Sequence, residues 1–145
     1  MKAHMKKQSG FTLIEIMVVM VILGLLVAVV GPQILGRGEE ARIGVAKTQL
    51  RNISSALDLY KLDNFSYPST DQGLEALVSK PSGSPEAKNW NKNGYLPSVP
   101  KDPWGVEYQY ISPGSAGPYD LYSLGADQRE GGDEEGADIS INDLN

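Results

Sequence analysis

The first residue whose chemistry needs an explanation is Glu15, a carboxylate that stands directly before an apolar run from Ile16 to Val30. A charged side chain inside a bilayer costs roughly 2.5–3.5 kcal/mol on insertion scales, so such a residue normally has a partner. In one interpretation Glu15 lies at a helix start, reaches the membrane interface and is stabilised by the helix dipole. In the other, the Gly10–Phe11 bond is cut, and the new α-ammonium of Phe11 pairs with Glu15 of a neighbouring copy.

A second group of reactive side chains crowds the C-terminal segment from Gly125 to Asn145, which holds seven acidic residues and one basic residue, Arg129. A hard cation such as Ca²⁺ takes roughly six to eight oxygen ligands and would relieve the repulsion among these acids. The alternative is a solvated acidic segment that binds nothing. The spacing does not fit an EF-hand loop, which needs alternating Asp or Asn ligands.

Catalytic chemistry has little support in this sequence. The chain has no cysteine, which removes disulfides, thiolate metal ligands and a catalytic thiol together. The one histidine, His4, lies among the first ten residues, and no glycine-rich phosphate loop follows a predicted strand. The net charge of −5, without a basic stripe interleaved with aromatics, argues against nucleic acid as a partner. We therefore expect no enzyme and no nucleic-acid-binding protein.

The apolar run is long enough to cross a membrane. A helix from Phe11 to Val30 would be about 30 Å long, which matches the hydrocarbon core of a bilayer. A secretory signal would carry a small-residue cleavage site after the run, whereas Gly31-Pro32 follows here. Lys2, Lys6 and Lys7 precede the run, and basic residues favour the cytoplasmic side. The sequence predicts a single-pass segment with its N-terminus inside and the remainder outside.

A second helical signal follows a weak point in the chain. Gly31-Pro32, Gly36 and Gly38 disturb a helix, and either a loop between two helices or a bend within one helix fits this pattern. Apolar residues then recur at helical spacing, which predicts one stripe packed on a small domain. These residues are Ile43, Ala46, Leu50, Ile53, Leu57 and Tyr60.

The C-terminal part has the pattern of a small mixed domain. Thr70 to Val78 predicts a short capped helix. Alternation from Val106 to Tyr110 predicts a half-buried strand, and a second strand from Tyr119 to Leu124 would complete a hairpin over the helical stripe. We assign the aromatics to core and loop packing rather than to a carbohydrate or base-stacking surface. They are Trp90, Tyr95, Trp104, Tyr108, Tyr110, Tyr119 and Tyr122.

The predicted fold class is therefore α+β, in which a long N-terminal helix, half transmembrane and half amphipathic, packs on a small antiparallel sheet head. The expected division has four segments. They are a leader over residues 1–10, a transmembrane and assembly helix over 11–35, an amphipathic helix over 36–62 and an α+β head with an acidic C-terminal loop over 63–145.

The residues Gly10-Phe11-Thr12-Leu13-Ile14-Glu15 follow a short basic leader and precede an apolar helix. This arrangement resembles the class III signal of type IV pilins and pseudopilins. The resemblance implies a type IV pilin-like fold. It also implies that a membrane-embedded prepilin peptidase cuts between Gly10 and Phe11 and methylates the Phe11 nitrogen, and that Glu15 takes the family's assembly role.

Further motifs narrow the resemblance. Four stretches carry it: 58–64 (Asp-Leu-Tyr-Lys-Leu-Asp-Asn), 67–77 (Tyr-Pro-Ser-Thr-Asp-Gln-Gly-Leu-Glu-Ala-Leu), 102–105 (Asp-Pro-Trp-Gly) and 123–127 (Ser-Leu-Gly-Ala-Asp). From about residue 5 to residue 139 the chain resembles the major pseudopilins of type II secretion systems. The lack of cysteine agrees, because many type IV major pilins close a C-terminal loop with a disulfide and these pseudopilins do not.

This resemblance implies a structural subunit that polymerises through its N-terminal helix into a pseudopilus and drives export of folded proteins across the outer membrane. The implied partners are other copies of the chain, minor pseudopilins, an inner-membrane assembly platform and the prepilin peptidase. The implied location is the cell inner membrane, with a cytoplasmic N-terminus and a periplasmic head. The alternative is a major or minor pilin of a type IV pilus that serves adhesion, motility or DNA uptake.

The resemblance also bears on the acidic loop, because major pseudopilins bind calcium there. Leu124, through its backbone carbonyl, and Asp127 match the family's motif. Family members often have Asp or a small residue at the positions of Glu134 and Glu135, so the later ligands stay open. They are to be sought among Asp133, Glu134, Glu135 and Asp138.

Overall fold

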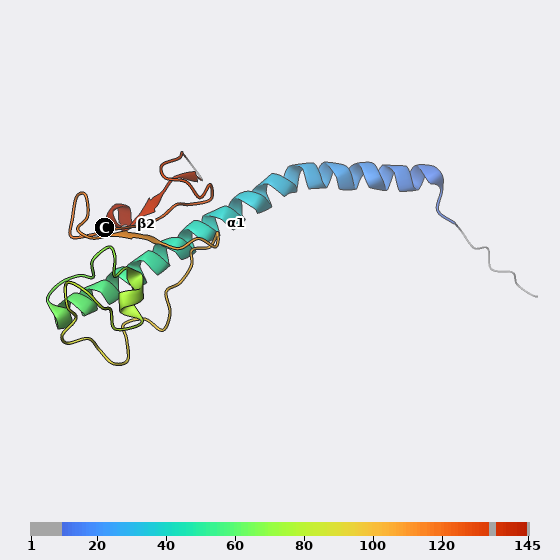
Figure 1. Ribbon diagram of the computed structural model, residues 1–145. Coiled ribbons are helices and arrows are strands. Elements are labelled where there is room, and N and C mark those ends of the chain that lie inside the picture. The colour runs from blue at the N-terminus through green and yellow to red at the C-terminus, as the bar shows by residue number, and fades with distance from the viewer. Residues whose placement is uncertain (1–9, 134–135, 145) are drawn as a thin grey trace, which may run out of the picture. The chain divides into compact units, whose positions relative to one another are not determined.

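A computed structural model describes residues 10–133 and 136–144, excepting the side chains of residues 34 and 35. The elements follow in the order α1 (Leu13–Asn64), η1 (Leu74–Leu77), β1 (Gln109–Ile111), β2 (Asp120–Ser123), β3 (Ile139–Ser140) and η3 (Ile141–Leu144) (Figure 1). The chain forms two compact units, residues 1–38 and residues 39–145, which we call the anchor unit and the head unit. We describe each unit separately.

Helix α1 runs without interruption through the predicted weak point. Pro32 lies inside the helix, and so do Gly31, Gly36 and Gly38. Proline removes one backbone donor, but a helix with many remaining bonds tolerates the loss. Of the two alternatives that the sequence left open, a loop between separate helices is excluded.

The core of the head unit forms along the predicted stripe of α1. Ala46, Leu50, Ile53 and Leu57 are fully buried, and Tyr60 is 1% exposed. Full burial of one such aliphatic side chain is worth about 1.5–3 kcal/mol. The stripe packs on residues from the sheet, η1 and the loops. These are Leu74, Ala76, Leu77, Ala87, Tyr108, Tyr110, Tyr119, Leu121 and Ile141.

The predicted hairpin is present as β1 and β2, which pair antiparallel with Tyr110 opposite Leu121. β1 begins at Gln109, three residues later than the predicted start at Val106. The carboxylate of Asp102 accepts the Val106 amide hydrogen, which holds residues 102–106 in a turn. β3 then extends the sheet in the order β1-β2-β3, with Ser123 opposite Ile139, and this strand was not predicted.

The predicted capped helix over 70–78 is wrong in length and type. Only η1, a 3-10 helix over Leu74–Leu77, forms, and no side chain caps it. Gly73 has φ 60°, a left-handed conformation that ends any helical run from the residues before it. Ser69 and Gln72 exchange two side-chain hydrogen bonds ahead of Gly73, so the local polar residues close a turn instead of a helix.

The aromatic residues pack as predicted, and their polar atoms are satisfied inside the head unit. The rings of Tyr67 and Tyr119 meet edge to face with centroids 4.9 Å apart. The Tyr110 hydroxyl donates to the Pro68 carbonyl at 2.8 Å, and burial raises the pKa of Tyr110 to about 12. Burial and the nearby Asp102 charge also raise the pKa of Tyr108, whose hydroxyl donates to Gln49.

Candidate functional site

Glu15 takes part in a capping box at the start of α1. Its Oε2 accepts the Thr12 amide hydrogen at 3.4 Å, and its own amide donates to Thr12 Oγ1 at 3.3 Å. The Thr12 amide thereby gains an acceptor within one chain, and the Glu15 amide, which also donates to the Thr12 carbonyl at 3.1 Å, gains a second one. Our sequence analysis missed this partner, although the pattern Thr-x-x-Glu before an apolar run is its known signature.

The bond predicted to be cut lies in an open part of the chain. Gly10 and Phe11 precede the helix, and Phe11 is 80% exposed. A Cβ atom built on Gly10 meets no atom within 4 Å, so the fold itself does not require glycine there. The leader prediction for 1–9 falls outside the described residues. The structure brings Gly10, Phe11 and Glu15 together at one end of α1.

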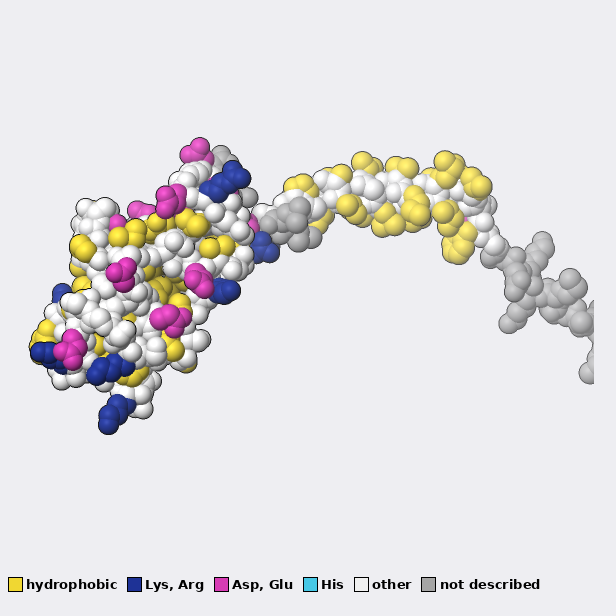
Figure 2. Space-filling view, in the orientation of Figure 1, with side chains coloured by type: hydrophobic (Ala, Val, Ile, Leu, Met, Phe, Trp, Pro, Cys, Tyr) yellow, Lys and Arg dark blue, Asp and Glu magenta, His cyan; other side chains and the backbone are white. Residues whose placement is uncertain are grey.

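The anchor unit exposes an apolar surface on all sides. Its large apolar side chains from Phe11 to Val30 are 43–80% exposed, and Figure 2 shows them covering the helix. Within the described part of the chain, α1 alone is long and apolar enough over one stretch to cross a membrane. No described residue of the anchor unit covers this surface. It therefore requires lipid, other copies of the chain, or both.

The acidic loop begins at a tightly held turn. The Gly125 amide donates to Ser123 Oγ at 3.2 Å, and Ser123 donates to the buried Asp102 at 2.7 Å. Gly125 has φ 69°, and a Cβ atom there would lie 2.8 Å from the Ala137 carbonyl oxygen. The backbones of Gly125 and Ala137 are therefore in close contact, which places the two ends of the loop side by side. Leu124, the predicted carbonyl ligand, sits within this turn.

Two predicted ligands carry features that suit a cation. A Cβ on Gly132 would lie 2.8 Å from Asp127 Oδ2, and one on Gly136 would lie 3.0 Å from it, so these two glycines make room for the carboxylate. Asp138 Oδ2 accepts the Gly131 amide hydrogen at 3.0 Å. Its Oδ1 is buried and has no hydrogen-bond partner in the described structure. A buried carboxylate oxygen without a donor is costly, and a bound cation would compensate it.

Of the remaining predicted ligands, the structure describes only Asp133. Asp133 is exposed, and Glu134 and Glu135 lie outside the described residues. Within residues 10–133 and 136–144, no three Asp, Glu, His or Cys side chains are grouped so that they could hold a metal ion. Asp127 and Asp138 fit a cation by their surroundings, and the calcium site stays a prediction.

Asp102, which the sequence offered only as part of the Asp-Pro-Trp-Gly motif, joins three parts of the head unit. It is 4% exposed, and its Oδ1 accepts the amide hydrogens of Trp104 at 3.1 Å and Val106 at 2.8 Å. Its Oδ2 accepts the Ser123 hydroxyl. The Asp-Pro-Trp-Gly motif is thus a turn closed by its own first side chain. The Trp104 indole in turn donates to Glu39 Oε1 at 2.9 Å, which ties this turn to α1.

Comparison with protein families gives two matches. Residues 33–142 match the model described as type II secretion system (T2SS), protein G, which covers more than half of the chain. Residues 5–31 match the prokaryotic N-terminal methylation motif, whose range contains Gly10, Phe11 and Glu15.

Individual relatives agree with the family match. The chain is 63% identical over 134 residues to the type II secretion system core protein G of Pseudomonas aeruginosa, which covers 92% of this chain and 94% of the relative. It is 56% identical to the same protein of Vibrio cholerae, over 93% and 92% of the two chains. A crystal structure of the major pseudopilin of enterohaemorrhagic Escherichia coli is similar at TM-score 0.65 and 40% identity, over 73% of this chain and 90% of that chain.

Proposed function

The chain belongs to the protein G family of type II secretion systems, the major pseudopilins, and from this premise we propose that it polymerises through α1 into a pseudopilus that drives export of folded proteins across the outer membrane. The observation that carries the proposal is the unpartnered apolar surface of α1 from Phe11 to Val30. Packing of many copies would bury that surface, and the free energy of burial is the driving force for association. The relatives are structural pseudopilins, and we infer a structural rather than a catalytic role for this chain.

Membership of the type II secretion family decides between the two kinds of filament that the sequence left open, the secretion pseudopilus and the type IV pilus. The family match names type II secretion, and the type IV pilus alternative is not favoured. The methylation motif and the apolar helix indicate a membrane anchor. We further propose the inner membrane as its location, with the leader lysines in the cytoplasm and the head in the periplasm, because basic residues are retained on the cytoplasmic side.

The proposed assembly step exchanges one partner of Glu15 for another. Cleavage after Gly10 by a prepilin peptidase would expose the Phe11 α-ammonium beside a helix start that Thr12 and Glu15 already define. In the apolar interior of a filament, the ammonium of one copy and the Glu15 carboxylate of the next would pair, since each charge is costly alone. Minor pseudopilins and an inner-membrane platform would act as further partners of the same helix.

Genetic complementation tests the proposed function. Loss of the gene should remove secreted enzymes from the culture supernatant while twitching motility continues, and the wild-type gene should restore secretion. The variant Gly10→Ala should not be cleaved. It should therefore fail to restore secretion and should run as a longer band on a gel. Normal secretion by the deletion strain, or loss of motility alone, would contradict the proposal.

We also propose that Ca²⁺ orders the acidic loop. The Leu124 carbonyl, Asp127 and Asp138 would hold it, with Asp133, Glu134 or Glu135 completing the oxygen shell. The ion would neutralise crowded carboxylates and link the two ends of the loop. The unpartnered Asp138 oxygen and the space around Asp127 support this assignment.

Thermal unfolding of a soluble fragment over residues 39–145 tests the calcium site. Ca²⁺ should raise the melting temperature relative to chelator, because a ligand that binds only the folded state stabilises it by mass action. Asp127→Ala should abolish the difference. Asp71→Ala, which removes an exposed acid outside the loop, should leave it intact. Equal melting temperatures with and without Ca²⁺ in the wild type would refute the site.

A further inference from the structure

Strand β1 lies at an edge of the sheet and directs part of its backbone away from β2. The order β1-β2-β3 gives β1 a neighbouring strand on the β2 side. On the other side, the Thr70 hydroxyl accepts the Ser112 amide hydrogen at 2.9 Å and donates to the Ser112 carbonyl at 3.0 Å. Just before the strand, the Val106 carbonyl accepts the Asp102 amide hydrogen at 2.8 Å. Because backbone groups alternate between the two edges of a strand, the amide and carbonyl of Tyr110 face this outer edge too.

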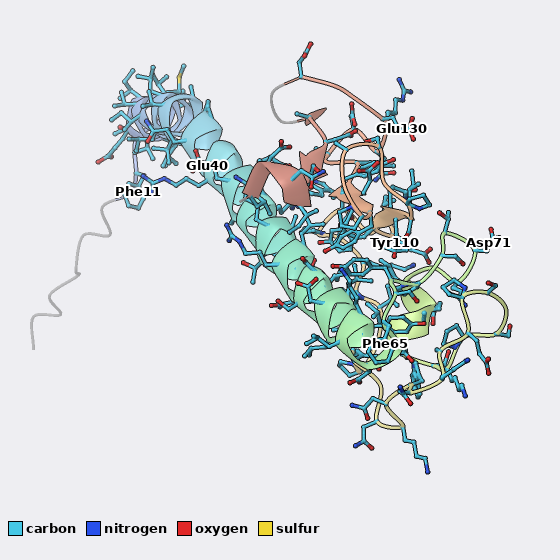
Figure 3. The ribbon with its side chains drawn as sticks, turned by 90° about the vertical axis from the view of Figure 1, so that its left-hand side faces the viewer. Phe11, Glu40, Phe65, Asp71, Tyr110 and Glu130 are labelled. Atoms are coloured by element: carbon cyan, nitrogen blue, oxygen red, sulfur yellow. The ribbon has the colours of Figure 1, made fainter. Side chains whose placement is uncertain are left out.

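A hollow of about 390 Å³ lies beside this edge, between β1 and residues 71–75 at the start of η1. Its size falls within the range of roughly 300–1,000 Å³ that ligand pockets occupy. Leu74 and Tyr110, which are 7% and 9% exposed, and the partly buried Val99 supply apolar lining. In the view of Figure 3, Tyr110 lies between the α1 ribbon and Asp71, which marks the outer side of the head unit. The hollow thus combines apolar contacts with the backbone of an edge strand.

The charged side chains around the hollow are mostly acidic. Among the described residues that line it are three acids, Asp71, Glu75 and Glu107, and one base, Lys101. All four side chains are exposed, so they can contact an occupant, and their net charge is −2. Such a rim favours an occupant with a Lys or Arg side chain over one with an acid.

The charge of the head unit as a whole argues against a second copy as the occupant of this hollow. Residues 39–145 carry 17 acids and nine bases, a net charge of −8, and a bound Ca²⁺ would leave −6. Two such units repel each other at long range, whereas a basic segment is attracted. The chain's own basic leader, with Lys2, Lys6 and Lys7, would be removed by the proposed cleavage on the cytoplasmic side. The occupant that fits this charge therefore belongs to another protein.

We propose that the hollow binds an extended, basic segment of another protein, which pairs with the outer edge of β1 as an added strand. Hydrogen bonds to the Tyr110 amide and carbonyl hold the segment, and alternate side chains enter the hollow over Leu74 and Val99. Its basic side chains contact the acids at the rim. The paired stretch is short, about three residues at roughly 3.3 Å each, because Thr70 and the turn at Asp102 occupy the two ends of the edge. This contact adds a partner to the proposed function and does not depend on filament formation.

Nuclear magnetic resonance of the isotope-labelled full chain in detergent micelles tests the contact with a defined probe. The probe is the pentapeptide acetyl-Val-Lys-Val-Lys-Val-amide, which is basic and prefers an extended conformation. It should shift the Tyr110 amide resonance in a saturable way. The same peptide with N-methyl groups on alternate backbone nitrogens keeps its charge but cannot pair, so it should bind at least about fivefold more weakly.

A second control peptide, acetyl-Val-Glu-Val-Glu-Val-amide, has the same length and the opposite charge, and it should not bind. Three results would overturn the proposal: no binding of the lysine peptide, equal binding of its N-methylated form, or equal binding of the glutamate peptide.

Substitutions at the rim locate the bound probe. Glu75→Gln and Glu107→Gln should each weaken binding of the lysine peptide several-fold at low salt, and Lys101→Gln should strengthen it. Glu86→Gln, which removes an exposed acid outside the hollow, is the matched control and should leave binding unchanged. An equal loss in the Glu86 and Glu75 variants would assign the binding to net charge and overturn the site. A shift of the Tyr110 resonance on concentrating the chain alone would place a second copy in the hollow, which would also contradict the proposal.

Discussion

At the scale of single residues, Glu15 has one partner in an isolated copy and a different one in the proposed filament. In the isolated copy its carboxylate accepts the Thr12 amide hydrogen. Such a capping interaction is worth about 1 kcal/mol, which is less than the cost of leaving a charge unpaired in an apolar interior. The ion pair with the Phe11 α-ammonium of another copy would therefore replace the cap when copies associate.

Two substitutions separate the roles of Glu15. Glu15→Gln keeps a side chain that can cap Thr12 but removes the charge, and Thr12→Ala removes the capping hydroxyl but keeps the charge. We expect both variants to be cleaved, Glu15→Gln to lose filament assembly and Thr12→Ala to retain most of it. Immunoblots of sheared filament fractions measure the yield. Equal assembly by Glu15→Gln and the wild type would show that the carboxylate charge is dispensable.

The role of a residue could be proposed from the sequence where that role depends on neighbouring positions in the chain. The positions of Gly10, Phe11 and Glu15 relative to the apolar run led directly to the proposed cleavage and pairing. Asp102 was missed because its importance comes from burial and from Ser123, which is 21 residues away. The unpartnered Asp138 oxygen was equally invisible, since Asp138 looks like any other acid in a charged segment.

At the scale of elements, periodicity predicted α1 well and the short elements poorly. The stripe from Ala46 to Tyr60 is buried because a 3.6-residue period leaves only one face toward the sheet. β3 is two residues long, so no alternation can reveal it, and its pairing with β2 depends on the loop between them. η1 is short because the left-handed backbone conformation of Gly73 ends the helical run. The pattern of apolar and polar side chains does not reveal that conformation.

Two leucines of α1 provide a matched test of the stripe. Leu57 is fully buried and Leu59 is 54% exposed. Leu57→Ala should lower the free energy of unfolding by about 2–5 kcal/mol, because a cavity remains in the core. Leu59→Ala should change it by about 0.5 kcal/mol or less. Urea titrations of the fragment over residues 39–145, followed by circular dichroism, give both values. Similar losses in the two variants would contradict the burial pattern.

At the scale of the whole molecule, composition predicted an apolar anchor, and helical spacing and strand alternation predicted a small α+β head. The uneven placement of apolar residues, concentrated before Gly31, separates a lipid-compatible part from a part with ordinary globular composition. The placement of the loops around the end of α1 was not apparent in this way. Asn89 is 25 residues beyond Asn64 in sequence, and only the fold brings it to the end of α1, where it donates to Asn64 and to the Asp63 carbonyl.

The buried tyrosines make the stability of the head sensitive to alkaline pH. Burial raises the pKa of Tyr110 to about 12, above its ordinary value of 10.0. The pKa of Tyr110 is higher in the folded state than in the unfolded state. The contribution of Tyr110 to stability is therefore fully present below the unfolded-state pKa, and it is lost as the pH rises through the folded-state pKa. The urea midpoint of the head should stay constant from pH 7 to about 9 and fall between about 10 and 12. Tyr110→Phe should reduce the fall, and an unchanged midpoint at pH 12 would contradict this.

The capping box at the start of α1 has a consequence for the exchange of subunits between the proposed filament and the membrane. In a subunit that waits in the bilayer, the hydrogen bond from the Thr12 amide would offset part of the cost of the Glu15 charge. In the proposed filament, the same partner would become available again when a subunit leaves, so depolymerisation would return capped subunits to the membrane. A cell could then shorten and regrow its filaments from one standing supply, without new synthesis for each cycle.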